Sequence, residues 1–411
     1  MPGLLVQVGA SVIMSLGTLL TGLCFTWPTF AIDTLQSDKS PTGSPFTEFE
    51  TNLVGSLVML GNLLVTPASA WISDMMGKKK ICILCALVFS LSWAIIATAR
   101  NSHLILIGRL IVGLASGVQL VICFPFVAEI SQDHIRGTLG SILILSFTFG
   151  MLIAYLIGWL CSYDVVNYIN LTLSVLFVLL ACGLKETPAF LIAKRKNEEA
   201  LKSLQFYRGA STATSEILEE MALLNEQNKS QVKSLVAEKS SNIGAEKELL
   251  EQMEVTRFDS EMSPLKMLCS SKPAQRALFV VTFHAFLIVL GGTIAMVTYA
   301  NQLFRQAAPN LSNELCTVIL AVAFFTGSVL SLMVSDLIGR RILMLTSTIL
   351  SATFLTLLAS LLRWSWAPEW TIPAAVLGYC CVFQMGAAVV PFLQVAECFI
   401  PKVDHYHLLS V

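Results

Sequence analysis

The stretch DMMGKKK at residues 74–80 decides the fold of this chain, because a near copy, DLIGRR, occurs at residues 336–341. Both copies place an acidic residue, a glycine and at least two cations between long apolar segments. A motif that recurs at the same position in two groups of apolar segments indicates an internal duplication. The sequence therefore predicts two related bundles of helices.

The composition indicates what kind of helices these are. Of the 411 residues, 55% are hydrophobic and 13% are charged, and the mean hydropathy is +0.73. Soluble domains carry about 25% charged residues, whereas about 20 mostly apolar residues in a row can span a bilayer. We therefore expect an all-α, polytopic membrane protein. Its predicted spans are 4–30, 51–72, 81–99, 103–129, 138–160, 165–184, 276–303, 313–334, 342–362 and 371–399.

These spans fall into a group of six and a group of four. We predict an N-terminal six-helix bundle at residues 1–184, a polar insert at 185–275 and a partial C-terminal bundle at 276–411. Apolar residues at three- and four-residue spacing in 197–207 and 215–227 predict two short amphipathic helices in the insert, without a core of its own. The chain then ends in DHYHLLSV, too short and polar for another span, so we expect an incomplete second bundle.

Charge and cysteine usage exclude several classes of function. The formal net charge of -1, with no broad basic face, argues against a nucleic-acid partner. Most of the eleven cysteines lie inside apolar segments, where cysteine packs as a small hydrophobic residue, and they lack the spacing of a metal site. The sequence contains no nucleotide-binding loop and no nucleophilic triad. We expect a non-enzyme without cofactor or metal, and the oligomeric state stays open.

The short loops predict how the chain crosses the bilayer. Cations cluster at residues 78–80 and 340–341, whereas the loops on the opposite side carry isolated cations. Loops rich in lysine and arginine stay in the cytoplasm, so we place both termini and the insert on that side. The sequon at residues 310–312 then falls in an outer loop, and Asn310 is a candidate for glycosylation.

The two repeated stretches also predict a gate. An acidic residue ending one helix, a glycine for the tight turn and cations starting the next helix can pair with carboxylates at neighbouring helix ends. Such pairs would latch the two bundles together on the cytoplasmic side in one conformation; the alternative is simple anchoring by positive charge. The predicted gate residues are Asp74, Gly77, Lys78, Lys79, Glu129, Arg136, Glu186, Asp336, Gly339, Arg340, Arg341 and Glu397.

Further motifs connect the chain to a family. Besides the repeats, it contains GRLIVG at 108–113, PFVAEISQDHIRG at 125–137, KETPAFL at 185–191 and VPFLQVAECFIP at 390–401. In this order and at these spans, they resemble the motifs of the sugar porters of the major facilitator superfamily, especially the insect trehalose-transporter-like members. The resemblance implies a plasma-membrane protein whose two bundles rock around a central cavity. It also places Gly108, Arg109 and Gly113 in the family's motif of the fourth span.

The chain departs from that family where the sugar site is expected. The amide positions implied by the resemblance hold Ile144, Ile288, Val289, Ile294 and Phe324, and the tryptophan position holds Phe392. The expected cavity is therefore unusually apolar. The candidate substrate contacts are Gln384, Thr293, Thr298, Tyr299, His284, Gln119 and Phe392.

For two of these candidates, a purely structural role is the alternative to substrate contact. The lack of an acidic residue in the first predicted span also bears on the mechanism. Gln384 is the first choice because an amide in mid-span is costly unless it is paired or faces a cavity; a hydrogen bond between helices is the alternative. For His284, packing competes with a role in proton transfer. The first span, 4–30, has no acidic residue, whereas proton-driven relatives place an aspartate there.

The resemblance therefore predicts facilitated movement of a trehalose-like or hexose-like sugar, or of a related small neutral solute. The alternatives are a non-transporting sensor or receptor relative and an inactive, truncated product. Arg109 is expected to face a bundle interior or to extend to the membrane surface, because a charge in lipid is costly.

Overall fold

The computed structural model describes residues 2–38, 40–210, 214–215, 217–226, 279, 282–283, 286, 290–307, 312–364, 368 and 370–390. Every regular element within these residues is a helix, which confirms the predicted all-α class. Nine of these helices are long and apolar enough to cross a membrane.

The N-terminal bundle contains the six predicted spans. Its first span continues to Leu35, because the chain turns only slightly at Trp27 before Pro28 starts a second short helix. The span therefore includes Asp33, and the expectation of a first span without an acidic residue is wrong. The helices are α1 (Pro2–Thr26), α2 (Pro28–Leu35), α3 (Glu48–Met76), α4 (Lys78–Thr98), α5 (Ser102–Ile130), α6 (Asp133–Leu160) and α7 (Tyr163–Cys182).

Small residues bring these helices into close contact. A Cβ atom on Gly22 would lie 2.1 Å from the carbonyl oxygen of Phe147, and one on Gly150 would lie 2.3 Å from that of Leu19. The backbones of α1 and α6 can therefore approach closely, as is typical of helices packed within membranes. Van der Waals contact, rather than hydrophobic burial, holds such helices together.

The two repeated stretches adopt the same backbone conformation. Gly77 has φ 91° and ψ 149°, and Gly339 has φ 84° and ψ 143°. This region of backbone space is open essentially only to glycine. The predicted duplication therefore extends to the backbone angles of the turn that joins the second helix to the third in each bundle.

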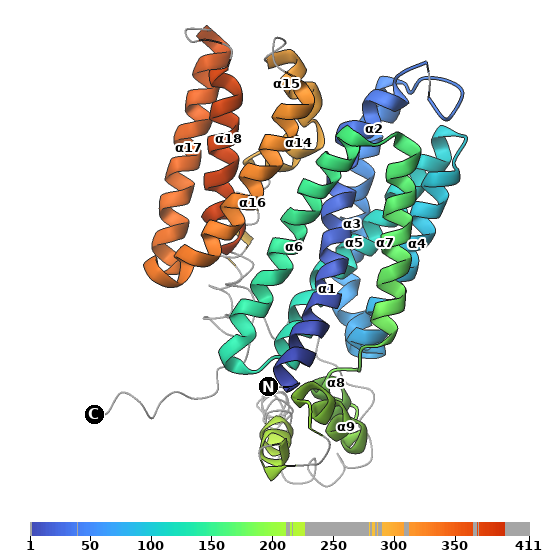
Figure 1. Cartoon of the computed structure of the whole chain (residues 1–411), viewed down its shortest axis with the longest axis vertical. Helices are drawn as coiled ribbons and strands as arrows, with labels where there is room; N and C mark the ends of the chain where they lie inside the picture. Colours follow the sequence, from blue (N-terminus) through green and yellow to red (C-terminus); the bar gives the residue numbers. More distant parts are fainter. Residues whose placement is uncertain are drawn as a thin grey trace, which may run out of the picture.

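The described part of the insert is helical and lies below the N-terminal bundle, next to the chain's start (Figure 1). Its helices there include α8 (Pro188–Ala193) and α9 (Asn197–Arg208), and residues 215 and 217–226 are helical as well. The amphipathic helices are thus confirmed for the described residues. In the described part of the insert, Leu191, Ile192 and Ala200 are buried together, packed against Met221 and Leu224. Residues 227–275 lie outside the described residues, so the expectation that the insert lacks a core of its own stays a prediction.

The described part of the C-terminal group has three long helices and two short ones. The predicted span 276–303 lies only partly within the described residues, and its last part is a broken helix that starts after Gly292, which has φ 71°. The helices are α14 (Thr293–Thr298), α15 (Ala300–Ala307), α16 (Asn313–Ile338), α17 (Arg340–Trp364) and α18 (Thr371–Phe383), the last continuing into a π-helix, Gln384–Ala388.

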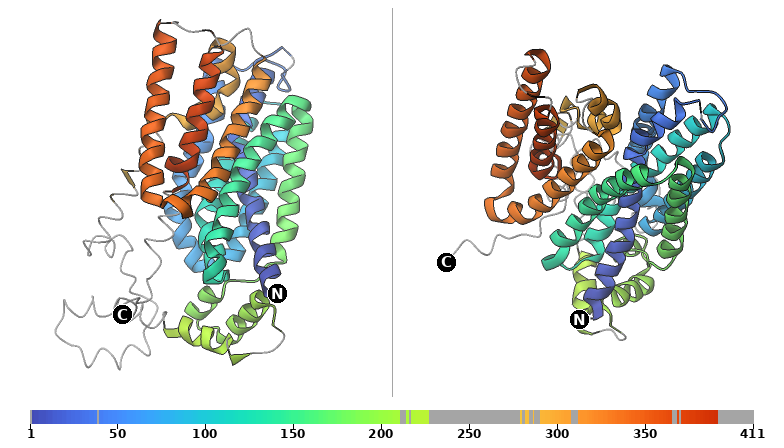
Figure 2. Two further views of the ribbon diagram at one scale, coloured as in Figure 1. Left: turned by 60° about the vertical axis from the view of Figure 1, so that its left-hand side comes forward. Right: turned by 45° about the horizontal axis from the view of Figure 1, so that its top comes forward.

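The two groups of helices lie side by side, as Figure 2 shows from two directions. Met151 and Tyr155 of α6 share a buried apolar cluster with Phe304 of α15 and Phe324 of α16, and this surface is the seam between the bundles. We call the end of the molecule with the turn at residues 74–80 and helices α8 and α9 the basic end. The end with α2 and α15 is the far end (Figure 1).

Candidate functional site: the seam and the two ends of the bundles

At the basic end, an ion pair joins the first repeated stretch to the end of α5. Lys78 Nζ donates to Glu129 Oε1 at 2.7 Å, and both side chains are largely shielded, with exposures of 14% and 26%. The other carboxylate oxygen, Glu129 Oε2, is buried without a hydrogen-bond partner. A shielded pair of this kind is costly to break from one side, because the remaining charge stays partly buried.

The Glu186 carboxylate caps the N-terminus of helix α4. Its Oε1 accepts hydrogen bonds from the backbone N–H groups of Lys79, at 3.0 Å, and Thr187, at 3.2 Å. A carboxylate at a helix N-terminus satisfies free N–H groups and interacts favourably with the helix dipole. Gly77 makes room for it, since a Cβ atom there would lie 2.4 Å from Glu186 Oε2.

The predicted gate is only partly within the described residues. Arg136 donates from Nε to the carbonyl of Ala128 at 3.1 Å, and Asp74 lies exposed on the last turn of α3. Glu397 and the side chains of Asp336 and Arg340 lie outside the described residues, and Arg341 is exposed. The contacts of Lys78, Lys79, Glu129 and Glu186 join helices of one bundle, so a latch between bundles stays a prediction.

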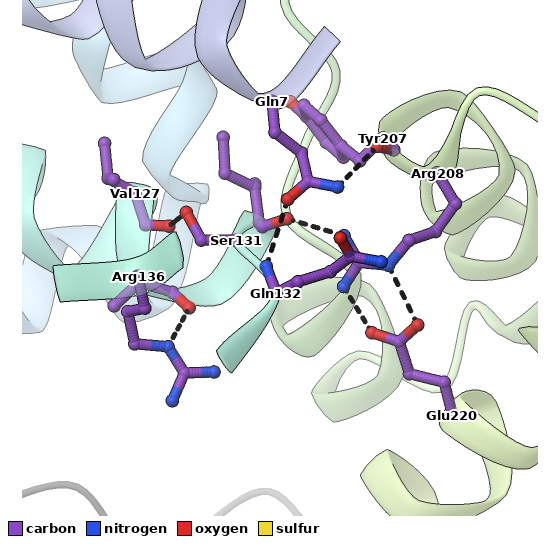
Figure 3. A network of polar contacts seen from close by, with 10 residues as sticks. Gln7, Val127, Ser131, Gln132, Arg136, Tyr207, Arg208 and Glu220 are labelled. Atoms are coloured by element: carbon purple, nitrogen blue, oxygen red, sulfur yellow. Dashed lines mark hydrogen bonds and ion pairs between the residues drawn. The ribbon is translucent and has the colours of Figure 1, made fainter. Parts of the chain in front are cut away.

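A second network at the basic end ties the insert to the N-terminal bundle (Figure 3). Gln7 donates from Nε2 to the carbonyl of Tyr207 at 3.1 Å and accepts from the backbone N–H of Gln132 at 3.0 Å. Arg208 donates to the carbonyl of Ile130 at 2.8 Å and binds the Glu220 carboxylate through two nitrogens. Helix α9 thereby connects α1, the α5–α6 turn and the next helix of the insert.

Tyr207 also contacts the start of the insert. Its hydroxyl donates to the carbonyl of Lys185 at 2.6 Å, and Ser203 Oγ donates to the carbonyl of Glu186 at 2.5 Å. Burial raises the pKa of the Tyr207 hydroxyl above its usual range, so the group stays a neutral donor. Helix α9 therefore also supports the segment that carries the capping carboxylate of Glu186.

Arg109 lies in the interior of the N-terminal bundle, only 1% exposed. It donates from Nε to the carbonyl of Val54 and from Nη1 to the carbonyl of Cys24, both at 3.0 Å, and its guanidinium lies 5.0 Å from the ring centre of Trp27. Carbonyl oxygens and an aromatic face can hold a buried cation. Of the two expected placements of Arg109, the bundle interior and the membrane surface, the structure has the first.

The other residues of the fourth-span motif are packing glycines. A Cβ atom on Gly108 would lie 2.6 Å from Ile96 Cγ1, and one on Gly113 would lie 2.5 Å from the carbonyl oxygen of Val58. Both positions bring α5 close to a neighbouring helix, α4 in the first case and α3 in the second. The motif therefore places Arg109 between tightly packed backbones.

At the far end, the two bundles share hydrogen bonds to one carbonyl group. Thr29 of α2 donates from Oγ1 to the carbonyl of Val297 at 2.7 Å, and Tyr155 of α6 donates to the same oxygen at 2.8 Å. Val297 lies in the last turn of the short helix α14, where carbonyl groups have no partner within the helix. The broken helix thus presents an acceptor that the other bundle satisfies.

Asp33 adds a second contact across the far end. Its Oδ2 accepts a hydrogen bond from Asn301 Nδ2, and its Oδ1 lies 4.0 Å from Arg305 Nη1. Asn301 and Arg305 both belong to α15, whereas Asp33 belongs to α2. The far end of the seam is therefore closed by polar groups from both bundles.

Three predicted substrate contacts gather near this seam. Thr293 Oγ1 lies 3.0 Å from the hydroxyl of Tyr379, which donates to the carbonyl of Gly291 at 2.7 Å. The Thr298 carbonyl lies 3.2 Å from Thr29 Oγ1. Tyr299 reaches α3 of the other bundle, since a Cβ atom on Gly55 would lie 3.0 Å from its hydroxyl.

The remaining predicted contacts lie elsewhere. Gln119 is fully buried and donates to the carbonyl of Met14 at 3.4 Å, while its Oε1 has no partner. Gln384 donates from Nε2 to Ser328 Oγ at 3.0 Å. Each amide therefore bonds within its own bundle in this conformation. His284, Phe392 and the sequon residue Asn310 lie outside the described residues.

A family model described as sugar (and other) transporter matches residues 16–405 of this chain. The chain belongs to this sugar transporter family. Because the family consists of transporters, the expectation of a non-enzyme is confirmed.

Curated relatives of this sugar transporter include two facilitated trehalose transporters Tret1. The one from Culex quinquefasciatus is 24% identical over 97% of this chain and 72% of its own length. The one from Aedes aegypti is 24% identical over 97% of this chain and 46% of its own length. The facilitated glucose transporter member 8 of solute carrier family 2 from Bos taurus is 26% identical over 80% of this chain and 61% of its own length. The chain thus spans about half to three quarters of these relatives.

Solved structures share the fold of this sugar transporter. The proton:xylose symporter XylE bound to 6-bromo-6-deoxy-D-glucose superposes with a TM-score of 0.72 at 18% identity, covering 95% of this chain and 82% of that chain. The inward-open xylose transporter XylE from E. coli gives a TM-score of 0.64 at 17% identity, covering 95% and 88%. The predicted major facilitator fold is confirmed.

Sequence reasoning missed the residues that close the far end of this transporter. Thr29 and Tyr155 are ordinary members of apolar spans, and their importance depends on where α14 ends. Asp33 could have been identified from the sequence, because an acidic residue next to an apolar span is energetically costly without a partner. Gln7 could have been identified in a similar way, because it is an amide residue near the start of the first apolar span.

Proposed function

We propose that this chain is a facilitative transporter that moves a sugar, trehalose-like or hexose-like, or a related small neutral solute by alternating access. The observation that carries the proposal is the seam, where a broken helix of one bundle offers a carbonyl to hydroxyl donors of the other. Such contacts are few and neutral, so they can form and break as the bundles rock. Membership of the sugar transporter family supports the same conclusion.

The orientation of the chain belongs to this proposal. The basic end would face the cytoplasm with both termini, because its turns carry the clustered cations. The far end would face outward at the plasma membrane, with Asn310 as a glycosylation site. The contacts of Val297 and Asp33 would then close the path on the outer side.

The predicted gate would work at the other side. Lys78, Glu129 and Glu186 hold one set of helix ends in place, and the second repeat offers a matching set of charges. We propose that Asp74, Arg136, Asp336, Arg340, Arg341 and Glu397 complete the latch when the inner side closes.

The proposed transport is not coupled to protons. Arg109 is held by carbonyls and by an aromatic ring, whereas the acidic residue of the first span, Asp33, contacts α15 at the far end. An acidic partner beside a buried arginine would offer a site for a coupling proton. The surroundings of Arg109 support passive movement down a gradient.

Gln384 is the substrate contact that the structure supports best. It opens a π-helical segment at the end of α18, and single π-helical turns are frequent at functional sites. Its bond to Ser328 could be exchanged for one to a sugar hydroxyl, since both are neutral hydroxyl groups. Thr293, Thr298 and Tyr299 would line the path near the seam.

Uptake into oocytes tests the proposal. The chain, expressed at the surface, should give saturable uptake of labelled trehalose, glucose or a related polyol, and uptake should not change with an imposed proton gradient. If the protein is present at the surface but no solute in the panel shows saturable uptake, the transport hypothesis is refuted. Binding without uptake would favour the sensor alternative.

A matched pair of variants tests Gln384. If the amide only bonds to Ser328, then Gln384→Ala and Ser328→Ala should change uptake equally, because each removes the same hydrogen bond. If Gln384 contacts the substrate, Gln384→Ala should raise KM well beyond the effect of Ser328→Ala. Equal KM values in the two variants would remove Gln384 from the substrate site.

A further inference from the structure

Arg109 carries a buried positive charge that no acidic side chain balances. Among the described residues, it is the one charged residue that is fully buried. The ionisable groups that act on it are Cys24 and Tyr163, which are both neutral at pH 7. The two carbonyls and the aromatic ring around the guanidinium stabilise its charge without cancelling it. A buried charge without a counter-charge is costly.

The ring of Trp27, at the junction of α1 and α2, connects Arg109 to three more polar side chains. Its ring centre lies 6.1 Å from that of Trp93 on α4 and 5.8 Å from that of Tyr163 on α7. Its Nε1 donates to Asn167 Oδ1 at 2.8 Å, also on α7. We call these five residues the indole cluster.

The indole cluster contains three buried polar groups without a hydrogen-bond partner, namely Trp93 Nε1, Asn167 Nδ2 and the Tyr163 hydroxyl. An indole N–H can only donate. The oxygen of Asn167 is identified by the bond that it accepts from Trp27, so the unpartnered atom of this amide is the nitrogen, which also only donates. The Tyr163 hydroxyl lies beside the Asn167 amide but outside hydrogen-bond geometry. The cluster therefore offers buried donors next to a buried cation.

This set of groups favours a small anion over a water molecule. A water that accepted two of these donors would also have to donate its own two hydrogens. The unpartnered Asn170 Oδ1, one turn deeper on α7, would take only one of them. A water would also leave the charge of Arg109 unbalanced. An anion accepts from several donors, forms stronger hydrogen bonds because it is charged, and balances the guanidinium.

Burial and position define the size and the route of the ligand. Trp27, Trp93 and Asn167 are fully buried, so a monatomic ion fits between them with less displacement than a polyatomic one. Tyr163 is the first residue of α7, which places the cluster near the far end of the bundle. The adjacent Asp164 is exposed, so solvent and salt screen its negative charge.

We propose that the indole cluster binds a chloride ion, or a similar small monovalent anion, as the counter-ion of Arg109. The donors to this ion are Trp93 Nε1, Asn167 Nδ2 and the Tyr163 hydroxyl. The ion connects α4, α5 and α7, so its binding stabilises the N-terminal bundle. The site lies within one bundle and does not depend on whether the chain transports a solute.

Thermal unfolding of the purified chain in detergent tests the proposal. Sodium chloride, sodium bromide and sodium gluconate are compared at equal ionic strength. The melting temperature should rise saturably with chloride or bromide, whereas gluconate, a large anion, should have no such effect. Trp93→Phe should weaken the apparent halide affinity about tenfold, the loss expected for one hydrogen bond to a charged group. Trp71→Phe, at an exposed tryptophan of α3, should leave the affinity unchanged.

A second variant supplies the negative charge covalently. Asn167→Asp keeps an acceptor for the Trp27 indole and replaces the donating nitrogen with a carboxylate oxygen. The carboxylate would balance Arg109 and repel a halide. The melting temperature of this variant should therefore be the same in chloride and in gluconate, and at least as high as that of the wild type in gluconate.

The outcomes distinguish an anion from the alternatives. Equal melting temperatures of the wild type in chloride and gluconate would overturn the proposal and leave an ordered water in the cluster. A chloride effect that persists unchanged in Trp93→Phe and Asn167→Asp would show that the halide binds elsewhere. Trp93→Phe keeps an aromatic ring in place, so the test stands even if Asn167→Asp fails to fold. Absence of solute uptake would not affect these results.

Discussion

The two ends of the molecule are held by different kinds of contact. At the basic end, charged groups join helices of a single bundle, as in the Lys78–Glu129 pair and the Glu186 cap. At the far end, mostly neutral groups join one bundle to the other, as in the bonds of Thr29 and Tyr155 to Val297. The difference teaches that charged contacts join helices within the N-terminal bundle, whereas mostly neutral ones lie at the seam, where the proposed alternating access requires the bundles to separate.

The largest expected effect is at the glycine of the first repeat. Gly77→Ala should lower the free energy of unfolding by about 3 kcal/mol, because the backbone region suits only glycine and the Cβ atom displaces the capping carboxylate of Glu186. Gly339→Ala should cost less, about 2 kcal/mol, since a Cβ atom there meets nothing within 4 Å among the described residues. Thermal unfolding in detergent would measure both, and equal losses would contradict the role given to Glu186.

A smaller effect is expected for the ion pair at the basic end. Glu129→Gln should destabilise the chain by about 1–2 kcal/mol, because Lys78 loses a charged partner in a shielded place. A double-mutant cycle with Lys78→Gln should give a coupling of similar size. Coupling near zero would mean that this pair contributes nothing to the rigidity of the N-terminal bundle.

At the far end, Tyr155→Phe should shift the balance between the bundles without unfolding either. The lost hydrogen bond is worth about 1 kcal/mol, which corresponds to roughly a fivefold change in the equilibrium. Cys316, a buried residue of the seam cluster, should then react about fivefold faster with a polar maleimide, as measured by peptide mass spectrometry. Tyr168→Phe, on an exposed face of α7, is the matched control, and equal rates in both variants would refute the seam contact.

The smallest effect should come from Arg305. Arg305→Gln should change the same labelling rate less than twofold, because the side chain is 72% exposed and its pair with Asp33 is long, and such surface pairs contribute about 0–1 kcal/mol. The effect should vanish at high salt. A change larger than that of Tyr155→Phe would reverse the order of the two far-end contacts.

The sequence was informative where a pattern has one physical meaning. Apolar length located the spans, and the repeated glycine predicted a turn that Gly77 and Gly339 form with the same backbone angles. The turn charges also identified Lys78 and Glu129 as parts of one network, and the structure pairs them directly.

The far end could not be predicted in the same way. The acceptor at Val297 exists only because α14 stops at Thr298, and nothing in the apolar run of residues around it marks that break. Tyr155 matters because α6 faces this carbonyl, which is a property of packing. Asp33 lay beyond the predicted end of the first span, so its pairing with α15 required the longer helix that the structure has.

The docking of α9 on the start of the chain has a consequence for how the protein is made. Gln7 bonds to Tyr207, a partner 200 residues later in the sequence. At about 5–20 residues per second, a ribosome takes roughly 10 to 40 seconds to synthesise that interval. Until the insert has been synthesised, the start of α1 therefore lacks its hydrogen bond to α9, and we expect a chaperone or the translocation machinery to have access to it during that time.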